Sequence, residues 1–343
     1  MLLSLEALES RAARTGLAGI PTKVRTGERL SPDEALAMYH TRDVTLLGAL
    51  ANEVRNARHG DTTYYNVNIH INYTNWCNKF CDFCAFQRRP GEDGAYRMSP
   101  EQIEEELRKA NPEATEVHMV AGVWPALGYD YYLDILRAAK RARPDIHVKA
   151  FTMVEIDQIV RTGKQVYGKS IEEVMADLRE AGLDSMPGGG AEVFSERLRQ
   201  EQYPKKMGHE RWLELAEQVH SLGFRTNATM LYGMGEILEE RVEHLRLLRE
   251  LQDRTGGFQA YIPLAFHPEN ADQLWIVNGN TSMTILTDVG SPEQEWWRRN
   301  GSGSQHFFSN ATPYGMFDLW NSTGTVSEWL AIGVPIFIWA VVV

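Results

Sequence analysis

Hydrophobic and polar positions along the chain follow two different periods. Residues 1–60 carry apolar side chains at a spacing of three to four, and Ser31 followed by Pro32 is typical of a helix N-terminus. From residue 61 to about residue 270, short β-rich runs alternate with amphipathic stretches, and Gly, Pro or Asn turns separate them. The pattern therefore predicts an N-terminal helical layer over residues 1–60 and an alternating strand–helix domain over residues 61–270.

Six short β-rich runs define the alternating domain. Strands that alternate with helices form a parallel sheet with right-handed crossovers, either as a barrel or as a doubly wound sheet. We favour an α/β fold, a partial or complete (β/α) TIM-type barrel, because the unusual residues gather just after strand ends, where barrel active sites lie. The predicted strands are residues 67–73, 116–120, 147–151, 183–186, 226–231 and 258–264. The predicted helices begin near Ser99, Tyr129, Ile171, Glu210 and Leu238.

Beyond about residue 270 the alternation stops, and Asn, Ser, Thr and Gly become frequent. We therefore predict a divergent tail of unknown fold over residues 271–343. Its last stretch, residues 330–343, is uncharged but is interrupted by Gly333 and Pro335. A helix that spans a bilayer needs roughly 20 apolar residues. We therefore expect this stretch to be buried or prone to aggregation rather than to anchor the chain in a membrane.

Charge and the N-terminal residues narrow the classes of function. The 343 residues include 35 Lys and Arg against 46 Asp and Glu, which gives a formal net charge of −11. A protein that neutralises phosphates needs a basic face, so this balance argues against non-specific nucleic-acid binding. The N-terminus has no basic segment followed by a long apolar run. We therefore predict no secretory signal and a cytoplasmic location.

All three cysteines of the chain fall within eight residues, as Cys77-x3-Cys81-x2-Cys84, directly after the first predicted strand. An odd, clustered set is not a disulfide framework and indicates a metal or redox site in a reducing compartment. Structural zinc sites and simple electron-carrying iron–sulfur sites use four protein ligands. Two interpretations stay open from the residues alone: a zinc site completed by His70 or His118, and a cubane cluster with one iron left open to bind a substrate.

The cysteine spacing, with the aromatic Phe83 before the last cysteine, resembles the signature of the radical S-adenosylmethionine (SAM) superfamily. The resemblance implies that Cys77, Cys81 and Cys84 hold a 4Fe-4S cluster, that SAM chelates the fourth iron, and that Phe83 lies near the adenine. It also implies that one electron from the reduced cluster cleaves SAM and releases a 5′-deoxyadenosyl radical, so that the cofactor supplies the difficult chemistry. We expect that electron to come from a donor such as flavodoxin or ferredoxin.

Further segments of the chain resemble one branch of that superfamily, the aminofutalosine synthases of the futalosine route to menaquinone. In that branch the adenosyl radical adds to the enol-ether double bond of 3-[(1-carboxyvinyl)oxy]benzoate. Aryl migration and loss of carbon dioxide, released as bicarbonate, then give 6-amino-6-deoxyfutalosine, with methionine as the other product. The resemblance implies a transferase that consumes SAM as a co-substrate. The segments, each beside a predicted strand end, are residues 72–75 (NYTN), 117–122 (VHMVAG), 148–156 (VKAFTMVEI), 187–192 (PGGGAE), 227–233 (NATMLYG) and 262–270 (IPLAFHPEN).

Two alternative functions stay open. Dehypoxanthine futalosine cyclase and the deazaflavin (FO) synthases share the segment before the cysteines but use the radical to abstract hydrogen. A chain whose tail fails to complete the barrel would be a non-catalytic cluster-binding protein. Two departures from the branch put the substrate contacts in question. Where it has Gly-Gly-x-His-Pro and Tyr-Gly-His, this chain has Ala121-Gly122-Val123-Trp124-Pro125 and Tyr232-Gly233-Met234.

Four residues near predicted strand ends are further candidates for the site. Gly122 lies where the superfamily's backbone contacts the methionine amino group, or it is an ordinary strand-to-loop glycine. Glu155 and Glu192 are candidates for binding the ribose hydroxyls or the amino group, or they are carboxylates at helix N-termini. His118 is a candidate catalytic acid/base or substrate contact if its side chain points into the barrel.

Two other patterns have competing explanations. The run Gly188-Gly189-Gly190 is either a tight turn or a place where the backbone closely approaches a ligand. The charged residues near the start of the last predicted helix are expected to form a solvated face. These residues are Glu239, Glu240, Arg241 and Arg246.

Overall fold

The main sheet of the protein is seen in a computed structural model, which describes residues 4–62, 64–266, 275–278 and 282–285. Its strands are parallel and lie in chain order, with β2 between β1 and β3, and with β4 beside β5. Single bridges from Lys149 to Ser185 and from Met186 to Thr226 join the two groups of strands. The strands are β1 (Asn68–Ile71), β2 (Glu116–Met119), β3 (His147–Ala150), β4 (Thr226–Tyr232) and β5 (Phe258–Ala265).

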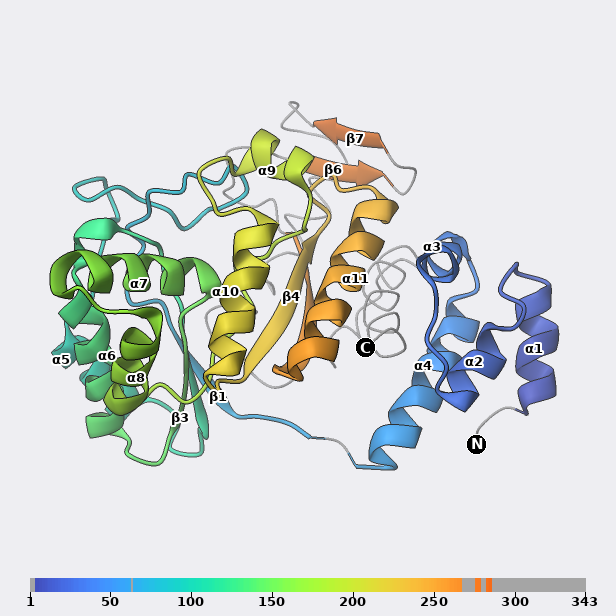
Figure 1. Cartoon of the computed structure of the whole chain (residues 1–343), viewed down its shortest axis with the longest axis horizontal. Coiled ribbons are helices and arrows are strands. Elements are labelled where there is room, and N and C mark those ends of the chain that lie inside the picture. Colours follow the sequence, from blue (N-terminus) through green and yellow to red (C-terminus); the bar gives the residue numbers. More distant parts are fainter. Residues whose placement is uncertain (1–3, 63, 267–274, 279–281, 286–343) are drawn as a thin grey trace.

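Helices connect the successive strands and pack around the sheet (Figure 1), so the described residues form a partial (β/α) barrel of the TIM type, as predicted. The helices of the barrel are α5 (Pro100–Lys109), the 3-10 helix η1 (Pro125–Leu127), α6 (Tyr129–Ala142), α7 (Met153–Tyr167), α8 (Ile171–Ala181), α9 (Glu196–Gln202), α10 (His209–Ser221) and α11 (Leu238–Thr255).

The predicted elements agree closely with these bounds. All five predicted helix starts lie at or beside observed ones, and five of the six predicted strands are confirmed. The sixth, residues 183–186, is reduced to the two single bridges between β3 and β4. Helices α7 and α9 were not predicted, although the Thr152 hydroxyl and the Glu155 carboxylate form a capping box at the start of α7.

The two faces of β1, β2 and β3 differ in polarity. Val117 and Val148 are fully buried, and strand alternation places them on the face that the helices of a (β/α) barrel cover. On the opposite face, His70, His118 and Lys149 stand directly opposite one another in the register of the three strands. The inner face of the sheet is therefore lined by polar side chains.

Four helices precede the sheet. The Ser31 hydroxyl accepts a hydrogen bond from the Glu34 N–H, and the Glu34 carboxylate accepts one from the Ser31 N–H. The predicted helix start at Ser31 and Pro32 is therefore confirmed and has a capping box. Leu46 and Leu50 are fully buried. The helices are α1 (Leu5–Ala13), α2 (Ile20–Thr26), α3 (Pro32–His40) and α4 (Val44–His59).

These N-terminal helices meet the barrel at α11, and α3 makes most of that contact. The Arg29 guanidinium pairs with the Asp253 carboxylate, and Arg249 donates a hydrogen bond to the Leu30 carbonyl at 3.2 Å. Residues 64–67, without regular secondary structure, then lead into β1. The domain boundaries at residues 60 and 270 stay predictions.

A separate antiparallel hairpin, β6 (Trp275–Asn278) and β7 (Ser282–Ile285), follows the barrel strands. Otherwise the predicted tail, residues 271–343, lies outside the described residues, as do residues 267–270 and the uncharged stretch 330–343. Among the helices that the structure describes, none is long and apolar enough to cross a membrane.

Two buried histidines of the barrel are held in their neutral form. His244 of α11 accepts a hydrogen bond from the Phe194 N–H at Nδ1 (3.1 Å), so its Nε2 carries the proton and donates to the Thr229 carbonyl at 2.9 Å. Burial lowers the pKa of His244 to about 3. His220 lies between the hydroxyls of Thr226 and Thr255, and burial lowers its pKa to about 4.

We expect these two histidines to make the fold acid-sensitive. Once unfolded, they take up protons below about pH 6.5, whereas the folded chain resists protonation until about pH 4 for His220 and pH 3 for His244. Their stabilising contribution is complete above pH 6.5 and falls as the pH drops, by up to about 1.4 kcal/mol per pH unit for each imidazole. Urea unfolding of cluster-free protein between about pH 7 and pH 5 measures this slope.

A matched pair of variants checks the assignment. His244→Gln removes one buried imidazole and is expected to flatten the pH dependence. His59→Gln changes an exposed histidine and is expected to leave the slope as it is in the wild type. An equal slope in all three proteins would contradict the role given to His244.

Candidate functional site

The three cysteines lie on one loop that leaves the carboxyl end of β1. All three are free thiols, with Cys81 buried and the other two half-buried. Two backbone hydrogen bonds hold the start of the loop: Cys77 N–H donates to the Arg88 carbonyl at 3.0 Å, and Asn78 N–H donates to the Val123 carbonyl at 2.9 Å. The loop therefore rests on the segment that follows β2, at the end of the sheet where barrel active sites lie.

The arrangement of donors fits a cluster better than a single metal ion. No three His, Cys, Asp or Glu side chains converge on one point among the residues that the structure describes. The described residues therefore give no support to a zinc site completed by His70 or His118, and His70 Nε2 lies 2.9 Å from Asn72 Oδ1. In a cubane cluster each thiolate binds a different iron, so three cysteines on one loop can hold three of its four irons.

Burial keeps two of the unligated thiols, Cys81 and Cys84, protonated. It raises the pKa of Cys81 to about 12 and also raises the pKa of Cys84. Iron binds the thiolate form, so loading of a cluster must release these protons.

Several buried polar atoms around the loop lack a hydrogen-bond partner. They are Trp76 Nε1, Asn78 Oδ1, Gln87 Oε1 and Gln202 Oε1, each without a partner in the described part of the chain. Unsatisfied buried polar atoms are rare in folded proteins, and one common reason is a missing ligand or water. Their gathering beside the cysteines fits a cluster together with a polar co-substrate such as SAM.

Gly122 packs against the cysteine loop so closely that a side chain has no room. A Cβ at this position would lie 2.3 Å from the Trp76 carbonyl oxygen and 3.0 Å from Cys77 Cβ. Its N–H donates to the Thr74 carbonyl at 3.1 Å. The structure therefore gives Gly122 a packing role in holding the loop, and its contact with a cofactor stays a prediction.

Phe83 is held on the barrel side of the loop by residues that follow α9. Its ring meets the Tyr203 ring edge-on at 5.7 Å between centroids, and Lys206 Nζ lies 5.6 Å from its centroid. Lys206 also forms an ion pair with Glu192, and both side chains are almost buried. Glu192 thus lies near Phe83, in the loop before α9. The interpretation of Glu192 as a carboxylate at a helix N-terminus is therefore wrong. Adenine contact by Phe83 and ribose contact by Glu192 stay predictions.

Glu155 is buried beneath the loop, and its carboxylate accepts three hydrogen bonds from different segments. The donors are the Tyr73 hydroxyl at 2.6 Å, the Ala121 N–H at 3.1 Å and the Thr152 N–H at 2.7 Å. Burial, partly offset by these bonds, raises the pKa of Glu155 to about 7. The helix N-terminal interpretation of Glu155 is confirmed, and its cofactor role stays a prediction.

His118 points to the inner, polar face of the sheet. Its ring meets the His70 ring edge-on at 5.2 Å between centroids, and Lys149 on β3 pairs with Glu116 at 2.7 Å on the same face. Burial, followed by the neighbouring His70 and Lys149, lowers the pKa of His118 to about 3. The neutral imidazole keeps a buried Nε2 without a partner in the described residues. Its catalytic or substrate-binding role stays a prediction.

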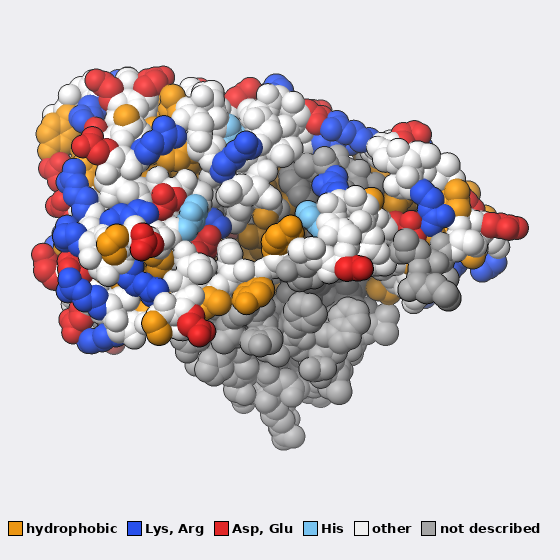
Figure 2. All heavy atoms as spheres, turned by 90° about the horizontal axis from the view of Figure 1, so that it is seen from below, with side chains coloured by type: hydrophobic (Ala, Val, Ile, Leu, Met, Phe, Trp, Pro, Cys, Tyr) orange, Lys and Arg blue, Asp and Glu red, His pale blue; other side chains and the backbone are white. Residues whose placement is uncertain are grey.

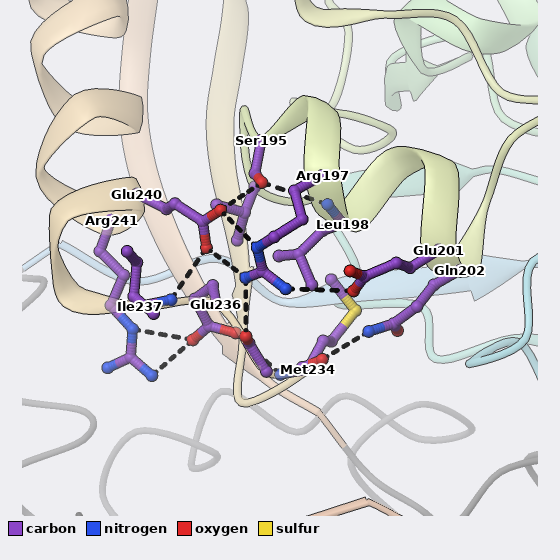
Figure 3. A network of polar contacts seen from close by, with 12 residues as sticks. Ser195, Arg197, Leu198, Glu201, Gln202, Met234, Glu236, Ile237, Glu240 and Arg241 are labelled. Atoms are coloured by element: carbon purple, nitrogen blue, oxygen red, sulfur yellow. Dashed lines mark hydrogen bonds and ion pairs between the residues drawn. The ribbon is translucent and has the colours of Figure 1, made fainter. Parts of the chain in front are cut away.

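Two other expectations are decided by packing. A Cβ on Gly188 would lie 2.4 Å from the Asn227 carbonyl oxygen, so the glycine run allows close contact with the backbone of β4. The predicted solvated face of α11 is wrong for Glu240 and Arg241. Glu240 binds Arg197 and Ser195, and Arg241 binds the fully buried carboxylate of Glu236 (Figure 3).

One buried side chain beside the loop was not predicted at all. Gln202, the last residue of α9, is 1% exposed. Its backbone carbonyl accepts a hydrogen bond from the N–H of Asp82, which lies between two of the cysteines, at 2.9 Å. Helix α9 was not predicted, and a glutamine is usually exposed. The sequence therefore gave no sign that Gln202 is buried against the cysteine loop.

Comparison with known proteins agrees with this geometry. The family model of the radical SAM superfamily matches residues 71–248. The chain is 46% identical over 251 residues to the aminodeoxyfutalosine synthase of Thermus thermophilus, with 73% of this chain and 66% of that protein covered. It is 38% identical over 254 residues to the cyclic dehypoxanthine futalosine synthase of Halalkalibacterium halodurans, with 74% and 68% covered.

The fold also resembles solved structures. The crystal structure of methylornithine synthase superposes with a TM-score of 0.57 at 15% sequence identity, over 73% of this chain and 69% of that chain. At this identity the likeness concerns the fold alone. The chain spans just under two thirds of the Thermus relative's length, 66%.

Proposed function

The chain belongs to the radical SAM superfamily, and from this premise we propose that it joins the adenosyl group of SAM to 3-[(1-carboxyvinyl)oxy]benzoate. The products are 6-amino-6-deoxyfutalosine, methionine and bicarbonate, as in menaquinone biosynthesis by the futalosine route. The observation that supports this choice within the superfamily is the 46% identity to an aminodeoxyfutalosine synthase. The cysteine loop at the carboxyl end of β1 supplies the site at which such chemistry would occur.

The residues of the loop have separable tasks in this proposal. Cys77, Cys81 and Cys84 would hold the 4Fe-4S cluster, and the cluster, when bound, supplies the one-electron chemistry that cleaves SAM. Gly122 lets the loop lie against the segment after β2, and Glu155 fixes that segment to β1 and α7.

The polar inner face of the sheet would receive the benzoate substrate. His118, neutral at physiological pH, offers a hydrogen bond there rather than a positive charge. The loops after β2 and β4 have Trp124 and Met234 in place of the histidines of the branch. Substrate contacts made there by an imidazole elsewhere in the branch must be made by other groups in this chain.

A second candidate function rests on the second relative. The 38% identity to a cyclic dehypoxanthine futalosine synthase supports hydrogen abstraction instead of addition, as in that enzyme or the FO synthases. A non-catalytic cluster-binding protein is the third.

One anaerobic assay separates the three functions. Protein reconstituted with iron and sulfide is mixed with dithionite, SAM and the enol-ether benzoate, and the products are identified by mass spectrometry. We expect the adenosyl adduct to form together with methionine. Free 5′-deoxyadenosine without adduct would favour hydrogen abstraction, and a bound cluster with neither product would favour the non-catalytic function. A protein that binds no cluster would contradict all three.

The expected partners follow from the same proposal. The enzyme would take its electron from a small carrier protein such as flavodoxin or ferredoxin and would act in the cytoplasm on small molecules. On the face drawn in Figure 2, Lys and Arg side chains are interspersed with Asp and Glu, and no broad basic area stands out. The expectation that nucleic acid is not a partner rests on the net charge of −11.

A further inference from the structure

Gln202 is a buried amide with only part of its hydrogen-bonding capacity used. Its side chain at the end of α9 is 1% exposed, and its Nε2 donates to the Met234 carbonyl at 2.6 Å (Figure 3). Its Oε1 has no partner among the residues that the structure describes. Leaving a buried amide oxygen unsatisfied costs free energy, so the position calls for a donor.

The orientation of this amide is fixed by its neighbour. Exchanging its oxygen and nitrogen would set two acceptors, Oε1 and the Met234 carbonyl, against each other. Met234 cannot easily move away, because the Glu236 carboxylate accepts the Gly233 and Met234 N–H groups at 2.7 and 2.9 Å. Arg197 in turn donates to the Gly235 carbonyl at 3.0 Å. The free acceptor is therefore Oε1.

Gln202 joins two loops at the carboxyl ends of the strands, one through its backbone and one through its side chain. Through its backbone carbonyl Gln202 binds the N–H of Asp82 in the cysteine loop, and through its side chain it binds the loop after β4. A cluster at the cysteines presents sulfur atoms, which accept hydrogen bonds and cannot satisfy Oε1. SAM carries N–H and O–H donors on its amino acid, ribose and adenine groups.

We propose that Gln202 is a SAM-binding residue whose Oε1 accepts a hydrogen bond from an N–H or O–H group of SAM bound at the cluster. This inference rests on the proposed function for its ligand and adds a contact that neither the cysteine motif nor the strand-end segments indicate. The bond to Met234 pre-orients the acceptor, so that SAM meets a side chain already in position.

The test measures SAM binding to reconstituted enzyme with the cluster oxidised, so that SAM is not consumed. Gln202→Met keeps a similar volume and removes the acceptor, and we expect the Kd for SAM to rise at least about tenfold. Gln202→Glu, protonated by burial, can donate to the Met234 carbonyl and still accept through its second oxygen. We expect it to restore the affinity to within about threefold of wild type. Gln200→Leu, an exposed glutamine on the same helix, is the control and should bind SAM like the wild type.

A spectroscopic readout separates binding from scaffolding. The electron paramagnetic resonance spectrum of the reduced cluster without SAM should be the same in wild type and Gln202→Met. A changed SAM-free spectrum, or an unchanged Kd in Gln202→Met, overturns the inference. Gln202→Leu replaces Gln202→Met if the latter does not hold its cluster. If wild-type enzyme itself binds no SAM, the proposed function fails, which is distinct from failure of this inference alone.

Discussion

Replacing Cys81 by alanine is expected to yield a folded protein that holds no cluster and forms no product. With one thiolate removed, two cysteines remain, and two protein ligands cannot keep a cubane in place. Cys81 is the most buried of the three, and in the described residues no histidine or carboxylate lies ready to complete the set. Loss of the brown colour after reconstitution, iron analysis and the product assay measure the effect, which should reduce activity below detection.

The control for this variant is Ala85→Ser, a small change beside Cys84 that leaves all three thiols in the loop. It should take up iron like the wild type. Circular dichroism of the cluster-free proteins should agree for the wild type and both variants, because Cys81→Ala removes a single sulfur atom from the core. If Cys81→Ala keeps its iron and its activity, the ligand assignment is wrong.

Removal of the Glu155 carboxylate is expected to have the largest effect on stability. Glu155→Ala leaves the buried Tyr73 hydroxyl and the half-buried Ala121 and Thr152 N–H groups without an acceptor. We expect the free energy of unfolding to fall by about 3–4 kcal/mol, since each unsatisfied buried donor costs about 1–3 kcal/mol and some recover water. Tyr73 lies just before the cysteine loop, and Ala121 lies next to Gly122, against which that loop packs. We therefore expect the cluster content to fall as well.

Chemical unfolding of cluster-free protein measures this loss. Tyr73→Phe removes one donor only, and we expect a cost of about 1–2 kcal/mol. The double variant should show less than the sum of the two single effects, because both remove the same hydrogen bond. Glu180→Ala changes an exposed glutamate and should stay within about 0.5 kcal/mol of wild type. A Glu155→Ala protein as stable as Glu180→Ala would show that the carboxylate does not stabilise the strand ends.

The sequence predicted the strands well because their signal is local. The β-rich composition of residues 226–231 predicted a strand, and Ser99 followed by Pro100 predicted a helix start. Neither signal depends on distant residues. Helix α7 was missed although its capping box, Thr152 with Glu155, was legible in the sequence. Only two residues, Phe151 and Thr152, lie between the end of β3 and the start of α7, so the sequence shows no turn there.

The site was predictable only as far as its motif. The three cysteines and Phe83 are adjacent in sequence, whereas the contacts of Glu155 and Gln202 join residues 82 and 120 positions apart. Charge pattern alone could not tell that Glu240 and Arg241 of α11 face partners on other segments. Such pairings depend on the packing of α9 and the loop after β4 against α11, which no local period records.

The contact between the N-terminal helices and α11 has a consequence for biosynthesis. Arg29 and its partner Asp253 are separated by 224 positions in the chain. At about 5–20 residues per second, the ribosome needs roughly 11–45 s to reach Asp253 after it has added Arg29. Helices α1 to α4 share buried residues of their own, such as Leu8 and Leu46, and can associate during that interval. Their docking onto α11 is therefore a late step, completed only after nearly the whole barrel has been translated.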